Sequence, residues 1–355
     1  MEGESASGGS SPVASHVQLS DCIEELLKFV LQSSIDGTPG LDIGLSKDYC
    51  SGLLKDEPSS DIHILLAPHI YQGVPPYPLY KCLASALLQF ITSGCFCWTY
   101  EEVPLNCEDI SLIQTEEKWK KLILDKGSEL KNMLKSINLE LHVQEPFFSQ
   151  LNDGVKTIEG RCSVDNYNRI QSGALILFNK CLLSEVQDIH HYASFMEMLE
   201  AEGLEKVLPG VVTIQEGVQI YRKFYTEEKE RSNGVIALCI CRPATRPDIV
   251  LAEIISGLSY DGIQRLLGLK KTAGTISEAL PPARSTLLSS FMLPHKSNVK
   301  SCTLTDGARA LAKHGNRNSS NYWGKLEGNV RRISGAVRGG WSFKEMEALG
   351  LALFM

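Results

Sequence analysis

Our prediction of the fold depends on one stretch near the middle of the chain, Gly154-Val155-Lys156-Thr157-Ile158-Glu159-Gly160-Arg161. In an extended segment, residues two apart point to the same face, so Glu159 and Arg161 are expected to be neighbours. Lys156 can join them only where the strand bulges or begins at a turn, and Gly154 permits such a turn. The stretch therefore predicts a strand that follows a glycine turn and gathers two basic side chains around one carboxylate.

Four of these residues form a recognisable signature. Gly154, Lys156, Glu159 and Arg161 reproduce the pattern G-x-K-x-x-E-x-R, and in this the segment resembles the ASCH domain, a PUA-like β-barrel named after activating signal cointegrator homology. The order of features from about residue 139 to residue 240 resembles that domain as well. The resemblance implies an α+β fold, namely a β-barrel with inserted helices, and a cleft that the signature lines and that binds RNA.

The residues before the signature predict helices. A capping-box pattern at Ser20 opens an amphipathic helix, and apolar residues at helical spacing predict two more over 79–91 and 116–137. Residues 1–15 are rich in Ser and Gly and predict a disordered tail. We therefore expect a helical N-terminal module at 16–137, which would bind protein partners.

The segment at 138–242 shows the pattern expected of the barrel domain. Alternating or continuous apolar residues predict strands, and apolar residues three or four apart predict helices between them. The predicted strands cover 139–143, 174–178 and 235–240, and the predicted helices cover 147–151, 192–202 and 215–225. Strands and helices in this order indicate an α+β barrel rather than a parallel sheet.

Charge divides the chain unevenly. The net charge of the 355 residues is -7, yet residues 261–355 hold 14 Lys and Arg against 6 Asp and Glu, a surplus of +8. Residues 139–240 hold 9 Lys and Arg against 15 Asp and Glu, which makes the barrel segment acidic at -6. Phosphate contacts dominate nonspecific affinity for nucleic acid, so RNA binding would need local positive charge or the basic end. We expect residues 243–355 to form a basic, partly disordered C-terminal extension.

The sequence predicts no metal site, no cofactor and no membrane span. The 11 cysteines show no C-x-x-C spacing, and His190 and His191 would face opposite sides of a strand. The start of the chain lacks the pattern of a signal peptide, and its apolar runs are too short to cross a bilayer. We expect an intracellular protein of the nucleus, the cytoplasm or both.

The signature supplies the candidate binding residues. An ammonium at Lys156 and a guanidinium at Arg161 provide a point charge and a planar fork for phosphate oxygens, and Glu159 would orient one of them. Aromatic residues near the signature are candidates for stacking on bases, and they are Phe147, Phe148 and Tyr167. The plainer alternative is an ion pair along a strand edge.

Three functions follow from this pattern. We predict an RNA-binding protein, of the regulatory or coactivator-type adaptor class. The first alternative is an amidohydrolase of an acylated nucleoside such as N4-acetylcytidine, because a small bacterial ASCH protein hydrolyses an acylated cytidine. Lys156 and Glu159 would then be catalytic, although Glu159 stands where that enzyme has threonine, and Glu197 and Glu200 are candidates for its later carboxylate. The second alternative is a protein-interaction scaffold whose cleft is vestigial.

Overall fold

The computed structural model describes residues 18–38, 40–56, 76–94, 110–163, 167, 170–269, 276–283, 286, 290 and 293. The expected tail at 1–15 and most of the expected C-terminal extension lie outside these described residues. The chain folds as two compact units. The first unit holds the described residues of 1–30 and 125–252, and the second holds those of 31–124 and 253–355.

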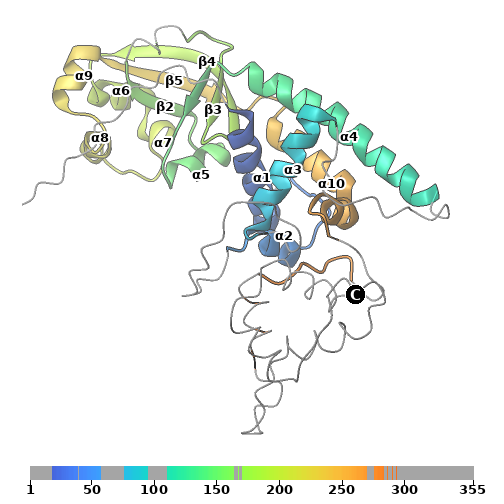
Figure 1. Ribbon diagram of the computed structural model, residues 1–355. Helices are drawn as coiled ribbons and strands as arrows, with labels where there is room; N and C mark the ends of the chain where they lie inside the picture. Colours follow the sequence, from blue (N-terminus) through green and yellow to red (C-terminus); the bar gives the residue numbers. More distant parts are fainter. Residues whose placement is uncertain are drawn as a thin grey trace, which may run out of the picture. The chain divides into compact units, whose positions relative to one another are not determined.

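A five-stranded mixed sheet forms the centre of the first unit (Figure 1). Its strands lie in the order β1-β3-β4-β5-β2; β1 pairs with β3 in parallel and the other pairs are antiparallel. Their bounds are β1 (Leu139–Leu141), β2 (Ile158–Cys162), β3 (Leu175–Phe178), β4 (Leu182–Tyr192) and β5 (Val235–Cys241). The sheet curls into a half-barrel flanked by helices, which confirms the α+β, PUA-like class that the sequence predicts (Figure 1).

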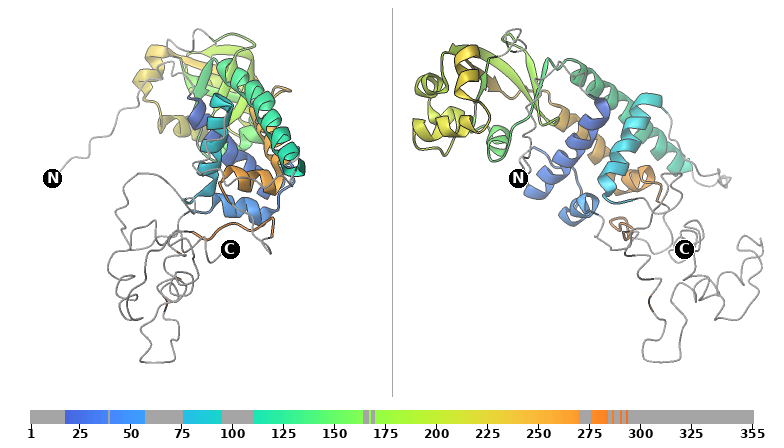
Figure 2. Two further views of the ribbon diagram at one scale, coloured as in Figure 1. Left: turned by 45° about the vertical axis from the view of Figure 1, so that its right-hand side comes forward. Right: turned by 60° about the vertical axis from the view of Figure 1, so that its left-hand side comes forward.

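Short helices fill the connections of this sheet. They are α5 (Phe147–Asn152), α6 (Phe195–Glu202), α7 (Leu204–Val207), α8 (Ile214–Arg222) and α9 (Glu227–Asn233). The yellow helices α8 and α9 stand beside the sheet in both views of Figure 2. Ser194, Thr213 and Thr226 cap α6, α8 and α9 by accepting a backbone N–H from the first turn of each helix, so the chain encodes where these helices begin.

The two faces of the sheet carry separate apolar clusters. Because side chains alternate along a strand, Ile158, Gly160 and Cys162 of β2 share one face with Ala237 of β5. That face packs on α6 and α8, and we call it the helix-covered face. Glu159 and its neighbours point to the opposite face, where strand residues such as Ile236 and Leu238 of β5 form the second cluster.

The remaining helices are α1 (Leu19–Asp36), α2 (Lys47–Leu54), α3 (Leu79–Ser93), α4 (Ile110–Lys135) and α10 (Pro247–Leu266). Of these, α2 and α3 belong wholly to the second unit. The helices predicted near Ser20, at 79–91 and at 116–137 are confirmed as α1, α3 and α4. The predicted capping box at Ser20 is wrong, because α1 begins at Leu19 and Ser20 Oγ donates to Asp21 within the first turn. Among the helices that the structure describes, none is both long and apolar enough to span a membrane.

Candidate functional site

The signature begins with a turn that its glycine makes possible. Gly154 has a φ of 73°, a left-handed conformation that favours glycine, and its N–H donates to the carbonyl of Leu151 at the end of α5. The next two backbone N–H groups, those of Val155 and Lys156, both donate to the Gln150 carbonyl at 3.0 Å. This turn directs the chain into β2 and sends the Lys156 side chain inward.

The Lys156 ammonium is buried and fully bonded, rather than open at the mouth of a cleft. Only 2% of its side chain is exposed. Its Nζ atom donates to the Ile158 carbonyl at 2.7 Å and to the Val207 carbonyl, and it lies 3.1 Å from Oε2 of Glu159. Three acceptors use all three N–H groups of an ammonium, so this arrangement requires the charged form.

Glu159 joins the two basic residues of the signature. Its Oε2 atom faces Lys156, and its Oε1 atom accepts a hydrogen bond from Nε of Arg161 at 2.7 Å. Burial alone would raise the pKa of Glu159, but the charges of Lys156 and Arg161 outweigh burial and lower this pKa. The carboxylate is therefore ionised at neutral pH, and the predicted same-face contact with Arg161 is present.

Arg161 is the outermost member of this network. Its side chain is 19% exposed, against 2% for Lys156 and 8% for Glu159. Its Nη2 atom donates to the His142 carbonyl at 2.7 Å, and the guanidinium also donates to the hydroxyl of Tyr225. Burial would lower the pKa of Arg161, but Glu159 more than offsets this, so the residue stays charged.

Gly160 lets two helices approach the signature strand closely, a role that the sequence reading missed. A Cβ atom at this position would lie 2.5 Å from the Tyr221 hydroxyl and 2.6 Å from Cε of Met198. The Gly160 N–H also donates to the Tyr221 hydroxyl. The Tyr221 ring in turn stacks on Phe195 of α6, with centroids 4.1 Å apart. Only glycine leaves room for this packing on the helix-covered face.

The three candidate stacking residues take part in packing. Tyr167 is 5% exposed and belongs to the second cluster, on the face of the sheet opposite α6 and α8. Phe147 is half-buried between the two clusters, and Lys156 Nζ lies 5.8 Å from its ring centre. Phe148 packs edge-on against Phe29 at 6.2 Å. A stacking role for these three residues stays a prediction.

The two carboxylates considered for hydrolysis lie on α6. Glu197 supports the start of the helix, because its Oε2 atom accepts the N–H of Ala193, the residue before the N-cap, at 2.8 Å, while Ser194 Oγ accepts the Glu197 N–H at 3.2 Å. Glu200 is exposed. The contacts of Glu197 thus serve the start of the helix.

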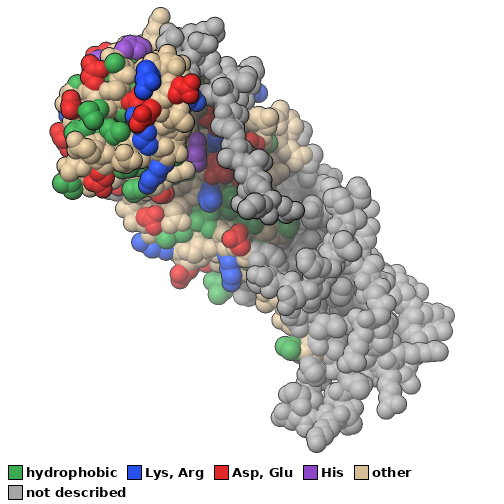
Figure 3. Space-filling model, turned by 90° about the vertical axis from the view of Figure 1, so that its left-hand side faces the viewer, with side chains coloured by type: hydrophobic (Ala, Val, Ile, Leu, Met, Phe, Trp, Pro, Cys, Tyr) green, Lys and Arg blue, Asp and Glu red, His purple; other side chains and the backbone are tan. Residues whose placement is uncertain are grey.

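Exposed charges of both signs share the surface around the helices. On the face that Figure 3 shows, Lys and Arg side chains are interspersed with Asp and Glu. The exposed charged residues of α7 to α9 and their connections include Glu205, Lys206, Lys223, Glu227, Glu228, Lys229 and Arg231. A broad phosphate-binding surface would need one dominant sign of charge, so the local charge at the signature carries more weight.

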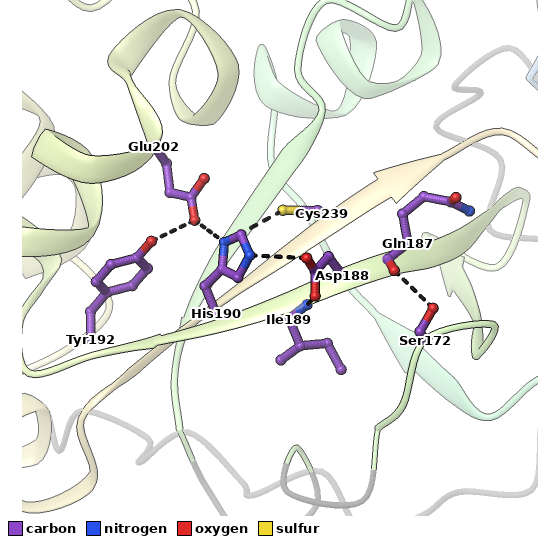
Figure 4. Close-up of polar contacts among 8 residues, drawn as sticks. All are labelled: Ser172, Gln187, Asp188, Ile189, His190, Tyr192, Glu202 and Cys239. Carbon is purple, nitrogen blue, oxygen red and sulfur yellow. Dashed lines mark hydrogen bonds and ion pairs between the residues drawn. The ribbon is translucent and has the colours of Figure 1, made fainter.

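A second polar cluster lies on the helix-covered face (Figure 4). We call it the His190 cluster, and its members are Asp188, His190 and Tyr192 of β4, Glu202 of α6 and Cys239 of β5. The Nδ1 atom of His190 lies 2.5 Å from Oε1 of Glu202 and 4.0 Å from Sγ of Cys239, and its Nε2 atom lies 3.1 Å from Oδ2 of Asp188. The Tyr192 hydroxyl donates to the same Glu202 oxygen at 2.7 Å. Sequence spacing offered no sign of this cluster, because its members come from three separate elements.

Hydrogen bonding and burial shift the pKa values in this cluster. The hydrogen bond that His190 donates to Glu202 raises the pKa of His190. Burial would raise the pKa of Glu202, but hydrogen bonds from Tyr192 and His190 lower it overall. Burial raises the pKa of Cys239, and burial together with Glu202 raises the pKa of Tyr192 to about 12. Each ring nitrogen of His190 faces a carboxylate oxygen, an arrangement that favours the charged imidazole.

Comparisons with known proteins find one family model and similar solved structures. Residues 141–243 match the family model of the ASCH domain. Among solved structures, the hypothetical protein PH0355 is 43% identical over 30% of this chain and 98% of its own chain, with a TM-score of 0.29. Protein PF0455 from Pyrococcus furiosus is 44% identical over 30% of this chain and 98% of its own, with a TM-score of 0.28. No curated protein matches the chain.

Proposed function

The chain belongs to the ASCH domain family through residues 141–243, and on this premise we propose that it binds single-stranded RNA with Arg161 as a phosphate-contacting side chain. The observation that carries the proposal is the charge balance of the signature. Lys156 and Glu159 neutralise each other in the interior, whereas Arg161 adds one positive charge at the partly exposed end of the network. The signature therefore holds a net charge of +1 within an acidic segment.

The network also orients the guanidinium before any ligand arrives. Glu159 holds Nε, and the His142 carbonyl holds Nη2, so the side chain has already lost much of its freedom. A fixed fork binds phosphate oxygens at a lower entropic cost than a mobile one. In this proposal, Lys156 and Glu159 position Arg161, and Gly154 provides the turn that buries Lys156.

The finer parts of the proposal concern biological role. We propose a regulatory or coactivator-type adaptor in the nucleus or the cytoplasm, with protein partners at the helical residues 16–137. The adaptor role rests on the resemblance to the ASCH family, and the expected protein partners rest on the predicted helical segment.

The test is the affinity of the full chain for a labelled, mixed-sequence single-stranded RNA, measured by fluorescence anisotropy. We expect Arg161→Ala to weaken binding by about 1 to 3 kcal/mol, the value of a charge-assisted contact. Arg231→Ala, which removes an exposed arginine on α9, is the matched control and should change affinity little. Equal affinities for wild type and Arg161→Ala would contradict the proposal and favour the scaffold alternative.

One observation favours the amidohydrolase alternative. Burial lowers the pKa of Lys156, as is common for lysines that act as bases or nucleophiles. The measurement is release of acetate from N4-acetylcytidine by the wild type and by Lys156→Arg. Turnover in the wild type and none in Lys156→Arg would establish hydrolysis, because a guanidinium does not give up its proton.

A further inference from the structure

We propose that His190, Glu202 and Cys239 form a zinc-binding site on the helix-covered face of the sheet. One ligand atom from each residue, an imidazole nitrogen, a carboxylate oxygen and a thiol sulfur, lies within 4.8 Å of the other two. Figure 4 shows the three side chains pointing toward one another from β4, α6 and β5. The site lies on the face of the sheet opposite Glu159, so its function can be tested separately from RNA binding.

The ligand types favour zinc over the other common divalent ions. A thiolate and an imidazole are preferred by zinc, whereas magnesium and calcium prefer oxygen ligands alone. Cys239, His190 and Glu202 supply sulfur, nitrogen and oxygen in one group. This combination fits the tetrahedral coordination in which zinc binds proteins.

The distances are close to those of a bound site. Typical zinc–ligand bonds and tetrahedral angles place a sulfur and a nitrogen ligand about 3.6 Å apart, and a nitrogen and an oxygen ligand about 3.3 Å apart. The Cys239 sulfur and His190 Nδ1 are 4.0 Å apart, and His190 Nδ1 and Glu202 Oε1 are 2.5 Å apart. A zinc ion would draw the sulfur in and replace the proton that Nδ1 and the carboxylate share. Glu202 ends α6, so its side chain can shift without breaking the helix.

Asp188 gives independent support for metal binding. Its Oδ2 atom lies 3.1 Å from Nε2 of His190, the ring nitrogen that the metal would not use. Histidines that ligate a metal commonly donate their other N–H to a carboxylate, which fixes the tautomer and orients the ring. Asp188 is thus a positioning residue, and it leaves Nδ1 as the ligand atom.

Three protein ligands leave the fourth position of zinc open. Structural zinc sites are usually closed by four protein ligands, whereas catalytic sites keep one position for water or substrate. His190 is 41% exposed at its side chain, so solvent reaches the site. The Tyr192 hydroxyl donates to the Glu202 oxygen that would bind the metal. The site would therefore accept a small donor such as water, a thiol or an imidazole.

Cobalt(II) is the probe for the test, because cobalt bound to a thiolate gives a charge-transfer band that reports the sulfur directly. The full chain is stripped of metal with a chelator and titrated with Co²⁺, and Zn²⁺ is then added to displace the cobalt. We expect one equivalent of cobalt to produce the band, Cys239→Ser to remove it, and Zn²⁺ to abolish it. Cys241→Ser is the matched control, since Cys241 is an exposed cysteine two residues along the same strand, and it should keep the band.

Two further variants keep the test decisive if Cys239→Ser fails to fold. Glu202→Gln retains the side-chain shape and should weaken cobalt binding at least tenfold. Asp188→Asn should weaken it roughly 10- to 100-fold, the usual effect of losing such a partner, while the thiolate band persists at saturation. No thiolate band in the wild type, or a band that persists in both Cys239→Ser and Glu202→Gln, would overturn the proposal. The cluster would then be a protonated histidine held by two carboxylates.

Discussion

At the scale of single residues, burial of Lys156 and Glu159 has a high desolvation cost, and each charge depends on a few specific partners. Two charges lose their hydration here: Lys156 is compensated by Glu159 and two backbone carbonyls, and Glu159 is compensated by Lys156 and Arg161. Removing one partner therefore leaves an uncompensated charge in the interior. Removing both leaves only the partly exposed Arg161 guanidinium, which keeps its hydrogen bond to the His142 carbonyl, and this difference makes the pair testable.

Glu159→Gln should lower the free energy of unfolding by about 3 to 5 kcal/mol, because the Lys156 ammonium would remain buried without its counter-charge. The double variant Lys156→Met with Glu159→Gln should recover part of this loss. Urea denaturation of the full chain measures both. Glu117→Gln removes a partner from an exposed ion pair with Lys120 and should change stability by less than about 1 kcal/mol. A Glu159→Gln effect as small as this control would contradict the burial of the pair.

The lowered pKa of Glu159 predicts how stability depends on pH. The unfolded carboxyl group titrates near its ordinary value of 4.5, and the folded one titrates below it. The stabilisation that ionised Glu159 contributes to the free energy of unfolding is therefore fully present above pH 4.5. It is lost as the pH falls through the pKa of Glu159 in the folded protein. Urea midpoints measured between pH 7 and pH 3 should fall more steeply for the wild type than for the double variant. Parallel curves would show that Glu159 has an ordinary pKa in the fold.

Residue spacing predicted one half of the signature geometry and missed the other. The two-residue spacing of Glu159 and Arg161 fixes their common face, and the structure has that contact. The depth of Lys156 depends on the Val207 carbonyl, which comes from α7 and lies 51 residues later in the chain. Local spacing carries no information on such a partner, and the same holds for the contact between His190 and Cys239, 49 residues apart.

At the scale of elements, Gly160 couples the signature strand to the helices. Gly160→Ala should destabilise the fold by about 1 to 3 kcal/mol, because the added methyl group would overlap Tyr221 and Met198 in a packed core. In a Tyr221→Phe background the penalty should shrink, since the nearest atom is the Tyr221 hydroxyl. Urea denaturation of the wild type, the two single variants and the double variant gives the coupling free energy between Gly160→Ala and Tyr221→Phe. Strictly additive effects would show that the hydroxyl is not the obstacle.

The elements with regular apolar spacing were the predictable ones. The strands expected at 139–143, 174–178 and 235–240 are confirmed as β1, β3 and β5. The 11-residue strand β4 was missed, since its second half is polar and its pairing with β5 shifts between Val186 and Asp188. The helix predicted at 192–202 begins later in the structure, where α6 starts at Phe195. Tyr192 still belongs to β4, and Ser194 caps the helix. Polar edges and register shifts weaken the periodicity on which such predictions depend.

At the scale of the whole molecule, the ASCH domain is joined to a much longer chain. The family model matches residues 141–243, which is less than a third of the 355 residues. The residues outside this match carry features of their own. The positive charge at residues 261–355 is the clearest such feature of the sequence.

The basic end should supply much of the salt-sensitive affinity for RNA. Residues 284–355 hold 11 Lys and Arg against 4 Asp and Glu, a surplus of +7. A chain that stops after Ala283 keeps the described contacts of Gln264 with 277 and 279 and loses this surplus. Its affinity for a generic single-stranded RNA should depend less steeply on salt, because fewer counterions are released. An unchanged salt slope would assign the electrostatic affinity to the remaining segments.

The central claim is that Arg161 contacts RNA while Lys156 and Glu159 hold it in place. The most direct measurement is the Nε–H resonance of Arg161 in the full chain, labelled with ¹⁵N-arginine, as single-stranded RNA is added. We predict that this resonance shifts as RNA binds, whereas the resonance of Arg231 stays in place, with both assigned from the two alanine variants. An Arg161 resonance that does not move while RNA binds would contradict the claim.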